Sequence, residues 1–151
     1  MKIIKNIRSS QEQEVVSIYP TETHVLVNKR DVTIDSMDGV ATLQYEYDCV
    51  VVENAQMYAD VVLAATEFYN TLRKAELLGN IIVTTTSGIR FYADDISRND
   101  LSNAILLSSV DTDTTMWKTP DGLKLVTVLD IKEALHLGLV EKGRIVGAIN
   151  V

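Results

Sequence analysis

The chain has 151 residues, enough for one ordinary domain or two small ones, and 46% of them are apolar and can fill a core. Its 14 basic and 21 acidic residues give a net charge of −7 without a cationic patch, which argues against a nucleic-acid-binding protein. The N-terminus lacks the apolar segment of a signal peptide and no apolar run is long enough for a bilayer, so we expect a soluble protein without membrane insertion.

The first half of the chain is predicted to be rich in strands. Short apolar runs occupy residues 14–19, 24–28 and 32–34. Residues 41–50 alternate with a period of two, and the apolar positions are Leu43, Tyr45, Tyr47 and Cys49. The positions between them are polar and comprise Thr42, Gln44, Glu46 and Asp48. This pattern predicts a half-buried strand whose polar face lies in water.

A long amphipathic helix is predicted to begin after Asn54, which is a good N-cap residue, and to end at Gly79. Its apolar stripe has helical spacing and consists of Tyr58, Val61, Ala65, Phe68, Leu72 and Ala75. The width of the stripe favours packing against the chain's own sheet. Because the spacing also fits heptads, a seam for self-association or for a partner is the alternative.

The second half has the pattern hairpin, helix, hairpin, helix over residues 81–139. Ser87 and Gly88 suit the first turn, and residues 119–122 suit the second, with proline and glycine in favourable positions. Ser97 with Asp100 resembles a capping box at the start of the first helix. Thr127 with Asp130 repeats this pattern before the last helix. The inward helix positions are expected to be Leu101, Ala104, Ile105, Ile131, Ala134, Leu135 and Leu139.

The predicted fold class is therefore α+β. A boundary near Gly79 and Asn80 divides the chain into a strand-rich module of residues 1–79 that ends in a long helix, and a small α+β domain of residues 80–151. No flexible linker marks this boundary, so the two halves are also compatible with one packed body.

Side chains that could carry chemistry are scattered along the sequence. Neither histidine has a metal-ligand spacing to an acid or a thiol, and the single cysteine, Cys49, is predicted to be a small buried filler. The pair Asp111 and Asp113 fails the pattern of a calcium loop. An enzyme would need His24, Asp48, Asp94 and His136 to converge. We therefore predict no catalytic residues, no cofactor and no metal site.

Several marks in the second half follow one another in a characteristic order. They are Gly88, Phe91, Ala93-Asp94, Ser97, Leu101, Trp117-Lys118, Asp121-Gly122, Leu129, Ile131 and Leu135. Over about residues 81–139 this order resembles a small uncharacterised domain of bacteriophage tail-fibre, baseplate and tail-assembly proteins. The resemblance implies structural anchors at Phe91, Ser97, Trp117, Asp121 and Gly122, with Ser97 capping a helix. It departs from that family at Leu106-Leu107 and at Gly138, Gly143 and Gly147, which are expected to interrupt the last helix.

The resemblance implies a structural protein of a phage tail or tail-like particle, made in the bacterial cytoplasm and placed at the baseplate or fibre attachment. Residues 1–79 would then be an attachment or oligomerisation module, by analogy alone. Its partners would be other tail, baseplate or fibre proteins. A homotrimer is the first expectation, with the helical stripe as its seam. The alternative is a tail-assembly helper that is absent from the mature particle.

Overall fold

The computed structural model describes residues 1–35, 39 and 41–149. The fold class is α+β, as predicted. The chain divides into two compact units, Met1–Leu72 (unit 1) and Arg73–Val151 (unit 2). This division falls inside a helix, several residues before the boundary that the composition suggested near Gly79.

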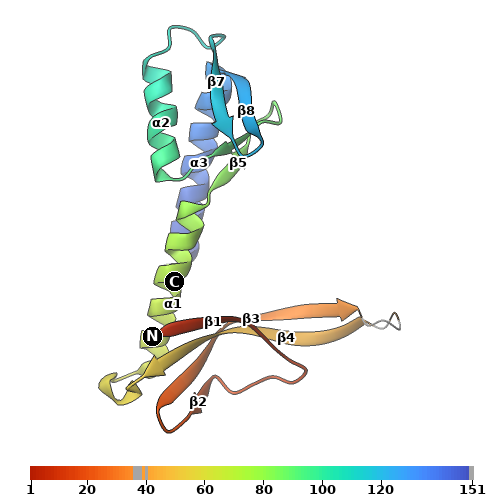
Figure 1. Ribbon diagram of the computed structural model, residues 1–151, viewed down its shortest axis with the longest axis vertical. Helices are drawn as coiled ribbons and strands as arrows, with labels where there is room; N and C mark the ends of the chain where they lie inside the picture. Colours follow the sequence, from red (N-terminus) through yellow and green to blue (C-terminus); the bar gives the residue numbers. More distant parts are fainter. Residues whose placement is uncertain (36–38, 40, 150–151) are drawn as a thin grey trace. The chain divides into compact units, whose positions relative to one another are not determined.

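Unit 1 contains a four-stranded antiparallel sheet with strand order β1-β4-β3-β2 (Figure 1). The strands are β1 (Lys2–Ser9), β2 (Val16–Ile18), β3 (Glu22–Asp35) and β4 (Ala41–Glu53). β3 is one long strand where two short ones were predicted. β1 was not predicted, because basic residues interrupt its apolar alternation and the pattern is weak. Pairing with the strongly apolar strand β4 therefore explains why residues 2–9 form a strand.

The helix that follows β4 begins later than predicted. Asn54 has a left-handed backbone with φ 53°, and it precedes a short 3-10 helix, Ala55–Met57. Tyr58 is then extended, and helix α1 spans Val61–Gly79. The carboxylate of Asp60 accepts a hydrogen bond from the Leu63 N–H at 3.0 Å, which is the geometry of an N-cap. Tyr58 consequently lies outside the helix and is not part of its stripe.

The first half of α1 packs against its own sheet. Ala65 and Tyr69 are buried in one cluster with Val25, Val50 and Val52, and the half-buried side chains packed around it include Val61 and Phe68. The stripe does not continue as a buried face: Leu72 is 46% exposed, and Ala75 is exposed as well. The interpretation as packing on the chain's own sheet is thus confirmed for the residues before Leu72.

Unit 2 has the predicted order of hairpin, helix, hairpin and helix (Figure 1). Its elements are β5 (Ile82–Thr84), β6 (Arg90–Tyr92), α2 (Asp95–Leu106), β7 (Thr114–Thr119), β8 (Gly122–Thr127) and α3 (Val128–Ile149). Each hairpin is a two-stranded sheet, and the turn glycines Gly88 and Gly122 have φ angles of 81° and 99°. The buried core consists of Ile81, Val83, Phe91, Ala93, Leu101, Val126, Ile131, Ala134 and Ile145.

Three expectations about the helices of unit 2 are wrong, and they concern the cap of α2, the position Leu139 and the glycines of α3. The carboxylate of Asp94 caps α2 by accepting hydrogen bonds from the N–H and the hydroxyl of Ser97, each at 3.0 Å, so Ser97 is capped and is not the cap. The predicted cap of α3 does form, with the Asp130 N–H donating to the Thr127 hydroxyl at 3.1 Å. Leu139, which was expected to face inward on α3, is exposed.

The glycines of α3 do not interrupt it, because the helix is continuous through Gly138, Gly143 and Gly147. Gly138 has a packing role. A Cβ atom at this position would lie 2.7 Å from the Cβ of Ala93 and 3.4 Å from the Cδ of Arg98. The absence of a side chain therefore lets α3 approach the segment that leads into α2. Gly143 and Gly147 face open space.

Candidate functional site

A buried charged cluster lies in unit 1 around Asp48, the residue that the alternation of β4 had placed in water. Asp48 is only 3% exposed and Glu46 is 8% exposed. Asp48 has the same strand parity as Val50 and Val52, which pack against α1, so the predicted wet face is the one that this helix covers. The expectation of a solvated polar face is wrong for this stretch of β4.

Two β-bulges bring donors to Asp48. The register shifts between Ile4 and Ile7 on β1 and between Val27 and Arg30 on β3, one bulge on each side of β4. Each bulge contains an asparagine with a left-handed backbone, Asn6 at φ 61° and Asn28 at φ 52°. The backbone N–H of Asn6 and the side-chain amide of Asn28 both donate to the Asp48 carboxylate at 3.0 Å.

Charged and phenolic donors complete the cluster. Arg30 donates to both carboxylate oxygens of Asp48 at 3.2 Å and to Glu46 at 2.9 Å. The Arg8 Nε donates to Glu46 at 2.8 Å, and the Tyr69 hydroxyl of α1 donates to Asp48. No buried side-chain polar atom among the described residues lacks a hydrogen-bond partner. The cluster is thus internally satisfied, which is the condition for tolerating buried charge.

The electrostatics agree with this geometry. Burial by itself would raise the pKa of Asp48, but the hydrogen bonds from Arg30, Tyr69, Asn28 and Asn6 outweigh it and hold that pKa well below its ordinary value. The bonds from Arg8 and then Arg30 likewise lower the pKa of Glu46. Asp48 is therefore a fixed anion that links β1, β3 and α1 to β4. This role is structural, because every donor around it is already engaged.

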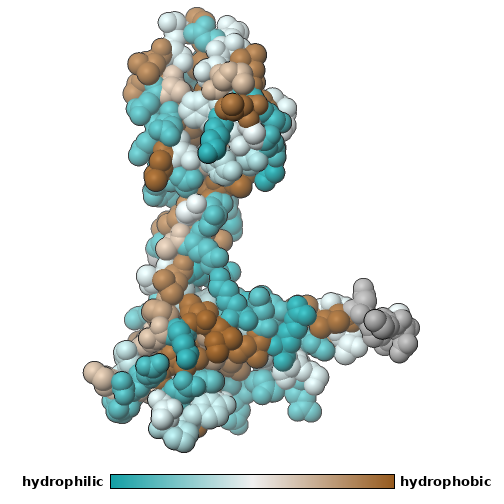
Figure 2. Space-filling view, in the orientation of Figure 1, coloured by the Kyte–Doolittle hydropathy of each residue, from teal (hydrophilic) through white to brown (hydrophobic). Residues whose placement is uncertain are grey.

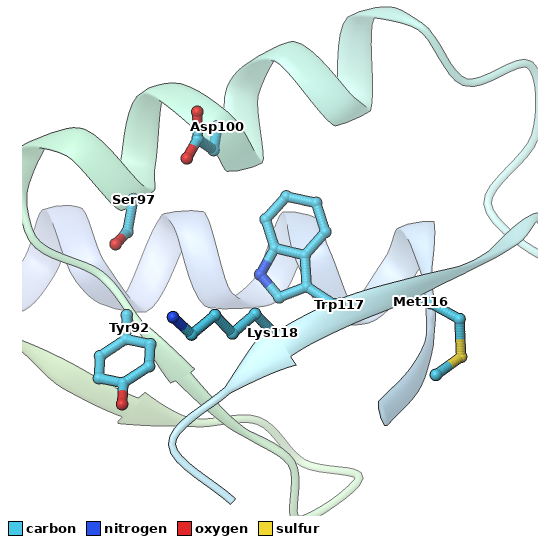
Figure 3. Close-up of a pocket in the computed structure, with 6 residues that line it drawn as sticks. All are labelled: Tyr92, Ser97, Asp100, Met116, Trp117 and Lys118. Carbon is cyan, nitrogen blue, oxygen red and sulfur yellow. The ribbon is translucent and has the colours of Figure 1, made fainter. Parts of the chain in front are cut away.

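A second feature, which we call the aromatic pocket, lies in unit 2 between β6, α2 and β7. Its volume is about 490 Å³, and its lining residues are Tyr92, Ser97, Asp100, Met116, Trp117 and Lys118. Figure 3 shows Trp117 projecting from β7 toward α2, with its indole nitrogen on the side that faces Lys118. The Lys118 side chain extends toward Tyr92 at the end of β6, and Met116 points the other way.

The polar groups of the aromatic pocket are available to a ligand. Within the described part of the chain, the side chains of Tyr92, Asp100, Trp117 and Lys118 make no hydrogen bond or ion pair. Ser97 differs, because its hydroxyl already donates to Asp94. Sequence reasoning singled out Trp117 but missed Tyr92, and it assigned Asp100 to a capping box that does not form. The adjacent Trp117 and Lys118 were the usable signal, because an aromatic residue next to a cation in a predicted strand can serve a binding site.

Several predicted anchors have structural roles. Phe91 is fully buried in the core of unit 2, and Trp117 packs partly against that core. The backbone N–H of Asp121 donates to the Thr119 hydroxyl in the β7–β8 turn, and its carboxylate binds Arg90 at 3.0 Å. Of the predicted stripe on α1, Leu72 and Ala75 remain exposed while Val61, Ala65 and Phe68 pack in unit 1.

The residues that an enzyme would have needed are spread over both units. His24 contacts Glu22 at 2.8 Å and lies in unit 1 with Asp48, whereas Asp94 caps α2 and His136 is exposed on α3 of unit 2. Cys49 is buried as predicted, and burial raises the pKa of its thiol. Among the described residues, no three His, Cys, Asp or Glu side chains form a group that could hold a metal ion.

Unit 2 also has an exposed apolar surface on its second hairpin. On the hairpin of β7 and β8, Met116 pairs with Leu125 and Lys118 pairs with Leu123, and these side chains share the outer face. We call Met116, Leu123 and Leu125 the apolar ribbon face, because all three are more than half exposed, Leu123 by 70%. Leu107 after α2 is 88% exposed. Figure 2 shows apolar residues at the surface on both the α2 side and the β7–β8 side.

Comparison of the chain with protein-family models, with curated proteins and with solved structures found no match in any of the three. In the part of the chain that the structure describes, none of the helices has the length and apolar character needed to cross a lipid bilayer. The functional conclusion therefore depends on the surfaces of the two units and on the sequence marks in residues 81–139.

Proposed function

We propose that this chain is a structural protein of a bacteriophage tail or tail-like particle, placed at the baseplate or at a fibre attachment, and that it acts through protein–protein contacts. The observation that carries the proposal is the apolar ribbon face of Met116, Leu123 and Leu125. Contiguous exposed apolar residues of this kind mark interaction surfaces, since leaving them in water is unfavourable. The resemblance of residues 81–139 to a phage tail domain is the reason for proposing a tail or tail-like particle.

The partners in this proposal are other tail, baseplate or fibre proteins, together with further copies of the chain. A homotrimer is the proposed assembly. The exposed part of the α1 stripe, at Leu72 and Ala75, is its candidate seam, because the earlier stripe residues pack within unit 1. Analytical ultracentrifugation of the purified chain tests this assembly. A trimer that Leu72→Glu converts to a folded monomer supports the seam, and a wild-type monomer contradicts it.

Quantitative mass spectrometry of purified particles tests the main proposal. The expected result is a stoichiometric chain in multiples of about three or six copies, as a symmetric tail requires. The double variant Leu123→Glu with Leu125→Glu should remain folded and be lost from particles. Thr114→Glu is the matched control, because Thr114 is exposed on the same face but lies outside the apolar ribbon face. Normal incorporation of the double variant would contradict the proposal.

A tail-assembly helper is the second candidate, since the resembling domain also occurs in assembly proteins. It would use the same apolar ribbon face transiently. In this case the chain would be absent from finished particles and would be recovered from the lysate in complex with one tail or fibre protein. The presence or absence of the chain in mature particles therefore separates the two candidates.

A further inference from the structure

The aromatic pocket of unit 2 combines a hydrophobic wall with polar groups of both kinds. Trp117 and Tyr92 come from different hairpins, and each carries a hydroxyl or N–H that has no partner within the described residues. The Asp100 carboxylate accepts hydrogen bonds only, whereas the Lys118 ammonium donates only. A ligand that satisfies this set must offer donors and acceptors at the same time.

The charges of the pocket select against an ionic ligand. Asp100 contributes one negative charge and Lys118 one positive charge, so the lining is formally neutral. An anion would gain from Lys118 and be repelled by Asp100, and a cation would meet the opposite arrangement. The best-matched ligand is therefore an uncharged molecule with polar groups around its rim.

The aromatic wall adds a requirement of shape. The faces of aromatic rings carry partial negative charge and favour flat apolar groups with polarised C–H bonds. A pyranose ring has such a C–H face, and each hydroxyl on its rim is a donor and an acceptor at once. The volume of about 490 Å³ lies within the range of small-molecule sites, about 300–1,000 Å³.

We propose that the aromatic pocket binds a neutral saccharide, with a pyranose ring against Trp117 or Tyr92 and its hydroxyls bonded to Asp100 and Lys118. This proposal goes beyond the proposed function and does not depend on it. Protein contacts would use Leu123 and Leu125 on the outer face of the β7–β8 hairpin, whereas the saccharide would lie against Trp117 between that hairpin, β6 and α2. Met116 and Lys118 border both regions, because they line the pocket and share the outer face with Leu123 and Leu125.

The single tryptophan of the chain provides a direct test. Glucose, galactose, mannose and N-acetylglucosamine, and an oligosaccharide of each, are titrated into the full chain. The indole N–H resonance and the tryptophan fluorescence then report on Trp117 alone. We expect a saturable change of both signals with at least one of these sugars.

Variants of the exposed pocket residues locate the site. Asp100→Asn and Lys118→Met are each expected to weaken binding about tenfold, because the first removes the charge that strengthens a hydrogen bond and the second removes a charged donor. Tyr92→Phe should weaken it less. The matched controls in unit 1 are Asp31→Asn and Tyr58→Phe, at exposed positions outside the pocket, and both should bind like the wild type. Dispersed amide spectra verify that every variant is folded.

Three results would overturn the proposal. The first is the absence of a saturable response of Trp117 to any of the sugars. The second is a response that Asp100→Asn and Lys118→Met leave unchanged, since the sugar would then bind elsewhere. Trialanine and inorganic phosphate are titrated in the same way, and the third result is a stronger response to either of them than to any sugar, which would assign the pocket to a peptide or to an anion. All three leave the mass-spectrometric test of particle incorporation unaffected.

Discussion

The two units differ in the charged residues that are most informative about each of them. Unit 1 buries Asp48, Glu46 and part of Arg30 at the centre of its sheet, and every one of these groups has matched partners. Unit 2 buries one charged residue, Arg98, which donates to the Ala93 carbonyl and pairs with Asp95, and it leaves Asp100 and Lys118 without partners among the described residues at an open pocket. The partners of a charged residue, more than its type, therefore indicate whether it stabilises the fold or is available to a ligand.

The largest expected effect is that of Asp48→Ala in unit 1. It removes the acceptor of Asn6, Asn28, Tyr69 and Arg30, and breaking a buried charge pair from one side costs about 3–5 kcal/mol. Urea denaturation followed through the amide resonances of β4 measures this loss. The control is Asp31→Ala at an exposed position of β3, with an expected change within about 0.5 kcal/mol. Equal effects of the two variants would refute the structural role of the cluster.

The same carboxylate should make unit 1 sensitive to acid. The pKa of Asp48 is lower in the folded state than in the unfolded chain, so at acidic pH the unfolded state binds the proton more readily. The stabilisation is therefore present above the ordinary aspartate pKa of about 4 and is lost as the pH falls below it. Urea midpoints of unit 1 between about pH 7 and about pH 3 should decline in the wild type.

The conservative variant Asp48→Asn keeps the shape of the side chain but cannot titrate. Its dependence on pH should accordingly be flatter than that of the wild type over the same range. Asp130→Asn is the matched comparison in unit 2, because it also replaces a carboxyl group with a lowered pKa. Hydrogen bonds from Ser87 and Thr127 outweigh the effect of burial and lower the pKa of Asp130. A decline of unit 1 that Asp48→Asn leaves unchanged would assign the acid sensitivity to other groups.

The contact between α3 and Ala93 in unit 2 should respond to side-chain volume. Gly138→Ala places a Cβ 2.7 Å from the Cβ of Ala93, and overpacking of this kind costs about 1–3 kcal/mol. Gly143→Ala on the same helix meets open space and should stabilise α3 by about 0.5–1 kcal/mol, because alanine is the better helix former. Thermal denaturation of the two variants should give shifts of opposite sign. Shifts of the same sign would contradict the close approach at Gly138.

The smallest effect concerns the start of α2. Asp94→Ala removes the cap that Ser97 donates to and should cost about 1 kcal/mol. Asp100→Ala should change stability by less than about 0.5 kcal/mol, since this carboxylate has no partner within the described residues. Urea denaturation monitored by circular dichroism compares the two. A larger loss of stability for Asp100→Ala than for Asp94→Ala would instead support Ser97 and Asp100 as the capping box.

Much of the fold could be predicted from residue patterns. The turns at Gly88 and Gly122, the cap of Thr127 with Asp130 and the inward positions Leu101 and Ile131 were all correct, because each depends on residues that are close in sequence. The predicted start of α1 was wrong, because residues close in sequence offered two possible caps. Asn54 and Asp60 are both good caps, and only the left-handed backbone at Asn54 decides between them.

The candidate site was less predictable. Trp117 was identified, but the pocket also needs Tyr92 from another hairpin and Asp100 from a helix, and no local pattern relates these three residues. The charged cluster of unit 1 was missed altogether. One signal was present, because asparagine is unfavourable in strands and both Asn6 and Asn28 interrupt apolar runs.

Residue patterns alone were enough to predict the α+β class, the order of the elements in unit 2 and the absence of a disulfide framework. These features follow from periodicity, turn residues and composition, which act over short stretches of chain. The burial of Asp48, the contact of Gly138 with Ala93 and the aromatic pocket became visible only in the folded chain. Each of these depends on side chains from distant elements, and their free energy of interaction arises only once the elements have packed.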